Sequence, residues 1–145
     1  MNKMKLRVTG TTDGVTTEVK AGKHTLILDE AAQMGGKDAG ANPLQYLLTA
    51  LAGCENVTAN FVAKQMEFDL QGITFEINGE FDPRGFMGDP NVRTFFEKVT
   101  VDAKVQTSES EERVKELQKM VEARCPVYGT FKAAGIEMID SWTKA

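Results

Sequence analysis

The first third of the chain alternates between apolar and polar residues in short runs, which is the pattern of antiparallel strands. Three such runs cover residues 5–8, 15–19 and 24–29. Turn residues separate them, at Asp13-Gly14 and at Ala21-Gly22. We therefore expect a three-stranded meander in this part of the chain.

The longest apolar stretch follows a glycine-rich loop and predicts a helix over residues 43–67. Asn42 is a favoured N-cap residue, and Pro43 suits the first position of a helix. Because this helix is apolar on nearly every side, we expect it to be buried at the centre of the fold. Near its middle, Gly53 leaves room for a neighbouring segment or a substrate to approach Cys54.

The second half of the chain predicts two strands, two helices and a final strand, over residues 70–81, 95–105, 108–125, 126–134 and 137–142. Ser108 and Glu111 have the spacing of a capping box for the first of these helices, and Pro126 ends it. The order βββαββααβ predicts an α+β fold with a mainly antiparallel sheet. The length suits a single domain, residues 1–145.

Composition is that of a soluble globular protein and narrows the range of partners. Seventeen Lys and Arg stand against 21 Asp and Glu, and the basic residues are scattered, so we expect no nucleic acid partner. Glu55, Asn56 and Asn60 interrupt the apolar stretch, which therefore does not predict a membrane span. The start, MNKMKLRV, turns polar at once and lacks the pattern of a signal peptide. We expect a cytoplasmic protein.

The two cysteines, Cys54 and Cys125, are the candidate reactive groups. With the single histidine, His24, they are too few for a structural zinc site, so we expect no metal. A structural disulfide is rare in the cytoplasm, and two buried free thiols are the plain alternative. Cys125 precedes Pro126 at the expected start of a helix, where thiol pKa values fall. The spacing of the two cysteines does not by itself make them a pair.

The segments around both cysteines resemble a known family. NPLQYLLTALAGC (42–54) and ARCPVYGTFKAAG (123–135) are similar to the cysteine segments of the OsmC/Ohr family, bacterial thiol-dependent peroxide reductases. The loop with Asp29-Glu30 and Gly35-Gly36 is similar too, and DPRGFMGDPNVR resembles a loop of one subgroup. The resemblance covers nearly the whole chain. It implies an OsmC-like fold in an intertwined homodimer, with antiparallel sheets packed on central helices.

The resemblance also implies a reaction. Cys54 matches the cysteine that attacks an apolar organic hydroperoxide, and Cys125 matches the cysteine that resolves the product. The attack yields a sulfenic acid, which the second thiol converts to a Cys54–Cys125 disulfide. A dithiol reductant, a small thiol or a lipoyl-type group, then restores both thiols without a cofactor.

The chain departs from the family's peroxidases at the start of the first helix. Those proteins carry a glutamate directly after the opening proline, where this chain has Leu44. They also carry an N-terminal arginine that pairs with that glutamate, and no residue here matches it clearly. Glu55, beside Cys54, and Arg84, in the loop, are the candidate supporting residues. The alternative function is a non-enzymatic redox or small-ligand-binding protein of the same fold, without an activated attacking thiol.

Overall fold

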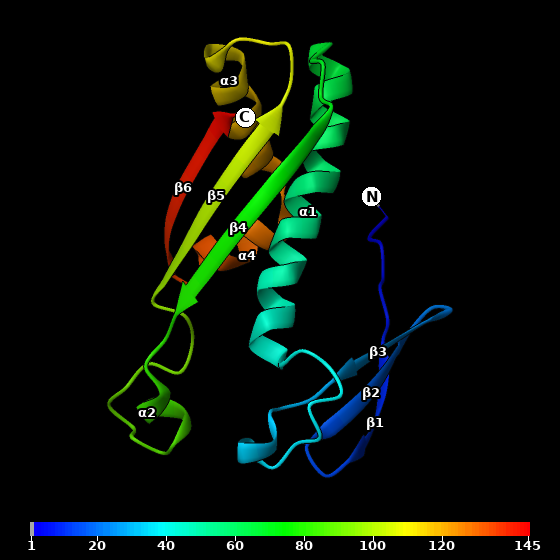
Figure 1. Ribbon diagram of the computed structural model, residues 1–145, viewed down its shortest axis with the longest axis vertical. Coiled ribbons are helices and arrows are strands. Elements are labelled where there is room, and N and C mark those ends of the chain that lie inside the picture. Colours follow the sequence, from blue (N-terminus) through cyan, green and yellow to red (C-terminus); the bar gives the residue numbers. More distant parts are fainter. Residues whose placement is uncertain (1) are drawn as a thin grey trace. The chain divides into compact units, whose positions relative to one another are not determined.

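The computed structural model describes residues 2–145 and divides into two compact units (Figure 1). The first unit ends at Leu47, and the second spans Leu48–Ala145. Within the described residues there are four α-helices and two three-stranded sheets, which confirms the α+β class. The expectation of one domain over residues 1–145 stays a prediction. None of the helices in this part of the chain is long and apolar enough to span a membrane.

The first unit is built on the expected antiparallel meander. Its strands follow one another in the sheet order β1-β2-β3, over Thr9–Asp13, Thr16–Ala21 and His24–Leu28. The turns between them contain Gly14 and Gly22, both with a positive φ of about 60°. Glycine adopts this left-handed conformation without steric cost, which explains its place in both turns.

The first strand lies later in the chain than the alternating pattern predicts. The turn at Gly14 sets Asp13 opposite Thr16, so that Thr9 pairs with Lys20 at the end of the ladder. Residues 5–8 therefore lie outside the ladder, and residues Leu6 and Val8 are 89% and 65% exposed. The prediction of a strand over residues 5–8 is wrong, because the turn and not the alternation sets the register.

The loop between β3 and the long helix is organised by a buried carboxylate. Asp29, only 1% exposed, accepts hydrogen bonds from the backbone N–H groups of Glu30, Lys37 and Ala39. These bonds hold the pKa of Asp29 below its usual value, although burial acts in the opposite direction. The loop also contains a short 3₁₀ helix, η1 (Ala32–Met34).

The helix α1 (Pro43–Met66) begins where its capping signal predicts. The N–H of Gln45 donates to Asn42 Oδ1 at 2.8 Å, and the N–H of Asn42 donates to Gln45 Oε1 at 2.9 Å. This reciprocal pair satisfies two backbone donors at the helix start. The prediction that Asn42 caps this helix is confirmed.

The second sheet has the order β4-β5-β6, with strands Gly72–Glu80, Lys98–Gln106 and Glu137–Lys144. The pair β4 and β5 is antiparallel, whereas β5 and β6 run parallel. The parallel pair arises because the chain crosses over through α3 (Glu111–Arg124) and α4 (Pro126–Ala133) before it returns to the sheet. A short helix, α2 (Pro83–Phe86), lies in the loop before β5 and was not expected from the sequence.

The start of α3 differs from the predicted capping box. Ser110 is the N-cap, and its hydroxyl oxygen accepts a hydrogen bond from the N–H of Arg113 at 3.2 Å. Ser108 instead donates its hydroxyl proton to Asp69 Oδ2 at 2.6 Å. The Ser108–Glu111 box is therefore wrong, because Asp69 competes for that hydroxyl and Ser110 offers the same chemistry two residues later.

The core of the second unit lies between one face of its sheet and the helices behind it (Figure 1). On β5 every second side chain is fully buried, namely Val99, Val101, Ala103 and Val105. The helix α3 buries the predicted apolar stripe, Val114, Leu117 and Val121, against this core. The helix α1 buries a single stripe, Leu51, Glu55, Ala59, Val62 and Ala63. One carboxylate therefore lies within an otherwise apolar stripe.

Candidate functional site

Cys125 lies at the junction of two helices. It ends α3 and is the N-cap of α4, and the N–H of Tyr128 donates to its Sγ at 3.4 Å. The predicted position of Cys125 at the start of this helix is confirmed. Its expected low pKa is wrong: burial raises the pKa of the Cys125 thiol to about 11, and the hydrogen bond from Tyr128 offsets this only in part. At neutral pH Cys125 is a thiol.

Cys54 lies in the middle of α1 and is partly exposed. Beside it, Gly53 is exposed; apart from its chain neighbours and its own helix backbone, no described atom lies within 4 Å of the place that a Cβ on Gly53 would occupy. The described chain therefore leaves open space at Gly53, next to the Cys54 thiol, as the glycine in the sequence predicts.

The fold brings the two free thiols together. The Cys54 thiol lies near enough to Cys125 to contribute to the raised pKa of Cys125, after the larger effect of burial. Contacts between the helices support this arrangement. Arg113 and Arg124 of α3 donate to the Met66 carbonyl oxygen and to Gln65 Oε1, near the end of α1. Two free cysteines far apart in the sequence thus lie near each other in the second unit.

Glu55 is enclosed in the core rather than exposed or paired with a lysine. It is 1% exposed, and neither carboxyl oxygen has a hydrogen-bond partner among residues 2–145. Burial raises the pKa of Glu55 to about 8, and the nearby carboxylates of Asp140 and Glu122 contribute to the rise. Glu55 is therefore a largely protonated acid at neutral pH.

Arg84, the other candidate supporting residue, lies in α2. Its guanidinium group binds both carboxyl oxygens of Asp82, and its side chain is 70% exposed. This pair holds the pKa of Asp82 down at about 2, through hydrogen bonds from Arg84. The positive charge of Arg84 is thus already paired, and a role for it beside Cys54 stays a prediction.

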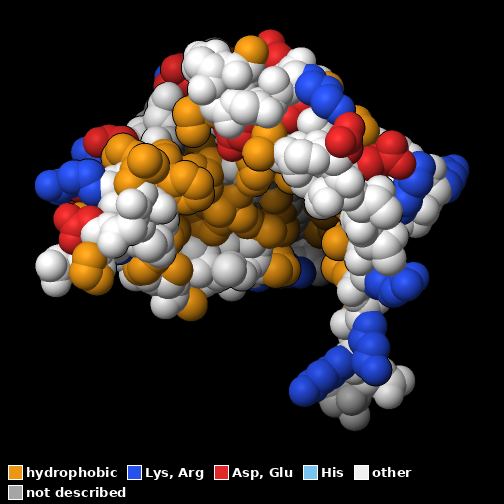
Figure 2. All heavy atoms as spheres, turned by 90° about the horizontal axis from the view of Figure 1, so that it is seen from below, with side chains coloured by type: hydrophobic (Ala, Val, Ile, Leu, Met, Phe, Trp, Pro, Cys, Tyr) orange, Lys and Arg blue, Asp and Glu red, His pale blue; other side chains and the backbone are white. Residues whose placement is uncertain are grey.

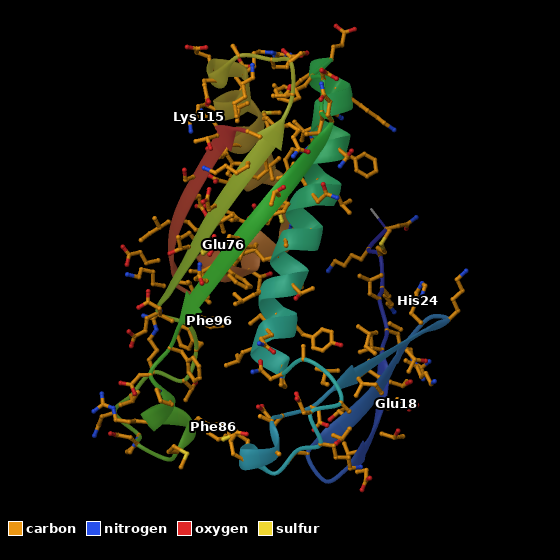
Figure 3. All side chains as sticks on the ribbon, in the orientation of Figure 1. Glu18, His24, Glu76, Phe86, Phe96 and Lys115 are labelled. Carbon is orange, nitrogen blue, oxygen red and sulfur yellow. The ribbon has the colours of Figure 1, made fainter. Side chains whose placement is uncertain are left out.

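The aromatic residues of this part of the chain take different positions. Phe86, on α2, is 75% exposed, whereas Phe96 is buried and meets Phe81 edge to face (Figure 3). Gly79 makes room for Phe96, since a Cβ there would lie 2.5 Å from the Phe96 ring.

The single histidine, His24, lies exposed on β3, in the first unit.

Three residues near Glu55 were not expected from the sequence, namely Glu122, Tyr128 and Asp140. Tyr128 donates its hydroxyl proton to Asp140 Oδ2 at 3.1 Å, and Glu122 accepts from Gln118 at 2.9 Å. A signal for Asp140 was present, because it alternates with Met138 and Trp142, and Trp142 is the type of residue that a strand turns inward. Across residues 2–145, no three His, Cys, Asp or Glu side chains are grouped in a way that could hold a metal ion.

Comparison with solved structures shows the same fold in several bacterial proteins. An OsmC-like protein from Mycoplasma pneumoniae has a TM-score of 0.86 at 21% identity, over 100% of this chain and 99% of that chain. An organic hydroperoxide resistance protein, OsmC, from Legionella pneumophila has a TM-score of 0.75 at 16% identity, over 99% of both chains. One from Elizabethkingia anophelis, with thiocyanate bound, has a TM-score of 0.74 at 18% identity, also over 99% of both.

Comparison with sequence families leads to the same group. No curated protein matches the chain. The family model described as "OsmC-like protein" matches residues 35–139, which include both cysteines. The chain therefore belongs to the OsmC family.

Proposed function

We propose that this protein reduces organic hydroperoxides through its two cysteines. The Cys54 thiolate attacks the outer peroxide oxygen, the O–O bond breaks, and an alcohol leaves after the alkoxide takes up a proton. Cys54 is then a sulfenic acid. The Cys125 sulfur attacks the Cys54 sulfur, the S–O bond breaks, and the Cys54–Cys125 disulfide and water form. An external dithiol then reduces this disulfide.

One observation carries the proposal: two free thiols from distant parts of the chain are neighbours, one partly exposed and one buried. The partly exposed thiol, Cys54, is accessible to a substrate, and the buried Cys125 suits the second step. Family members from Legionella pneumophila and Elizabethkingia anophelis that share this fold are named for resistance to organic hydroperoxides. A cytoplasmic location, as the sequence predicts, would supply the reducing dithiol.

A homodimer is part of the proposal. Outside its buried stripe, α1 carries exposed apolar side chains, with Val57 56% and Phe61 65% exposed. Together with Asn56, Asn60 and Lys64 they line a hollow of about 270 Å³. Figure 2 shows that many hydrophobic side chains are exposed on the surface of the described chain. A second copy of the chain would cover such surface.

Two observations favour the alternative, a redox or small-ligand-binding protein without peroxidase activity. Leu44 stands where the family's peroxidases carry a glutamate, and the charge of Arg84 is paired with Asp82. In this alternative the two thiols still form a disulfide, but no group activates Cys54 toward peroxides.

The deciding experiment is a single turnover of cumene hydroperoxide by two matched variants. We expect Cys125→Ser to consume one equivalent and leave Cys54 oxidised, whereas Cys54→Ser consumes none. Mass spectra of the peptides report which cysteine changes, and the wild type should contain one Cys54–Cys125 disulfide. If Cys54→Ser keeps the wild-type rate, the assignment of Cys54 is wrong. If the wild type reacts no faster than a free thiol, the alternative function is correct.

A further inference from the structure

The short helix α4 depends on the sulfur of Cys125 at its start. Its first residue, Pro126, has no N–H, and the N–H of Tyr128 donates to Cys125 Sγ at 3.4 Å. The N–H of Val127 acts on the same sulfur. A helix of eight residues is too short to be stable alone in water, so α4 relies on this cap and on its packing.

Tyr128 connects this cap to the second sheet. Its hydroxyl donates to Asp140 Oδ2 on β6 at 3.1 Å, while its backbone N–H donates to Cys125. Tyr128 and Phe131, three residues apart on one face, are the residues that α4 buries on the helix side of the sheet (Figure 1). The position of the Cys125 sulfur and the docking of α4 on β6 are therefore linked through a single residue.

The Cys125 sulfur has a second neighbour, the thiol of Cys54 on α1. Both thiols are free, and Cys54 lies near enough to act on the pKa of Cys125. A disulfide holds its sulfurs about 2.05 Å apart, whereas two free sulfurs in contact are roughly 1.5 Å farther apart. Closing the bridge therefore requires that at least one of the two sulfurs moves.

The movement falls on Cys125, because α1 is the larger and more firmly packed helix. The helix α1 has 24 residues and buries five of them, whereas α4 has eight residues and buries two. The bond from the Tyr128 N–H to the Cys125 sulfur is already long at 3.4 Å, so a shift of the sulfur away from α4 breaks it. The buried N–H of Tyr128 then lacks a partner, which destabilises the first turn of α4.

We propose that formation of the Cys54–Cys125 disulfide removes the cap of α4 and loosens this helix from β6. The inference rests on the disulfide of the proposed function, but not on peroxide as the oxidant. In that reaction the two thiols lose two electrons and two protons, which convert the hydroperoxide to an alcohol and water. The Cys125 sulfur is covered in the reduced protein, where the residue is 3% exposed, and the loosened α4 opens it to the reducing dithiol. Reduction then restores the cap.

Amide hydrogen exchange over α4 tests the inference. Diamide, a small oxidant that takes two electrons and two protons from a pair of thiols, forms the disulfide without peroxide, and peptide mass spectra identify it. In the oxidised protein, exchange over residues 126–134 should be about tenfold faster than in the reduced protein, which is the effect of losing one cap. Peptides of α3 from residues 111–120 should exchange equally in both states.

Two substitutions of Cys125 separate the cap from the disulfide. Cys125→Ser keeps a side-chain acceptor for the Tyr128 N–H, whereas Cys125→Ala has none. Without oxidant, Cys125→Ala should exchange over α4 about as fast as the oxidised wild type, and Cys125→Ser as slowly as the reduced wild type. Cys54→Ser leaves Cys125 without a partner thiol, so diamide should not change its exchange over α4. Thermal unfolding shows that each variant is folded.

The outcomes separate this inference from the proposed function. Equal exchange over α4 in the reduced and the oxidised wild type would overturn the inference, and so would equal exchange in Cys125→Ala and Cys125→Ser. If diamide forms no Cys54–Cys125 disulfide, both the inference and the second step of the proposed reaction are wrong. If the disulfide forms and α4 loosens, but the wild type consumes no peroxide, the inference stands and the peroxidase function fails.

Discussion

At residue 55 a carboxylic acid is enclosed by the fold, and its ionisation opposes folding. In the unfolded chain its pKa has the ordinary value of 4.5, whereas in the folded protein it is about 8. Below pH 4.5 Glu55 is neutral in both the folded and the unfolded state, so its ionisation does not reduce the free energy of unfolding. Between pH 4.5 and about 8 only the unfolded chain releases the proton, so stability falls as the pH rises, by up to about 1.4 kcal/mol per pH unit.

We therefore predict that Glu55→Gln stabilises the protein at pH 8 and has little effect at pH 4.5. Urea unfolding at both pH values measures the free energy of unfolding. Glu76→Gln is the control, because Glu76 is exposed on β4 (Figure 3), and it should leave the difference between the two pH values unchanged. Equal stability of Glu55→Gln and wild type at pH 8 would mean that Glu55 is not enclosed in solution.

At the scale of an element, the loop before α1 depends on close approach of two backbone segments. A Cβ on Gly40 would lie 2.1 Å from the carbonyl oxygen of Ile27 in β3, so the backbone would have to move. We expect Gly40→Ala to destabilise the protein by roughly 1–3 kcal/mol, the usual range for overpacking.

Gly129→Ala is the matched substitution in a helix. Nothing lies within 4 Å of a Cβ at Gly129 in α4, and alanine is a better helix former than glycine by about 1 kcal/mol. This variant should gain stability in the same urea experiment in which Gly40→Ala loses it. Equal effects of the two substitutions would contradict the packing of this loop against β3.

At the scale of the whole molecule, we predict a homodimer that uses the exposed apolar face of α1. Sedimentation at micromolar concentration should give a dimer, because Val57 and Phe61 are too exposed for a monomer's helix. Phe61→Glu places a charge in that face and should shift the protein toward the monomer. Lys119→Glu, on the exposed side of α3, should not. A wild type that is a stable folded monomer would refute the prediction.

The sequence by itself determined the elements whose signals are local. Asn42 and Cys125 cap α1 and α4 because a cap acts on an N–H only three residues away, and Pro43 and Pro126 restrict the same short segments. The apolar stripe of α3 likewise follows from helical spacing alone. The family, and with it the α+β fold, was evident from the residues around the two cysteines.

Tertiary structure decided what depends on contacts between elements. The register of β1 followed from its turn, and the hydroxyl of Ser108 went to Asp69, which lies in another loop. Packing of α1 beside α3 and α4 brought Cys54 to Cys125, and burial reversed the expected effect of the helix start on the Cys125 pKa. The same packing buried Glu55 in the core, where the charge of Asp140 acts on it. Proximity and desolvation arise only when distant segments meet, so no local pattern could predict them.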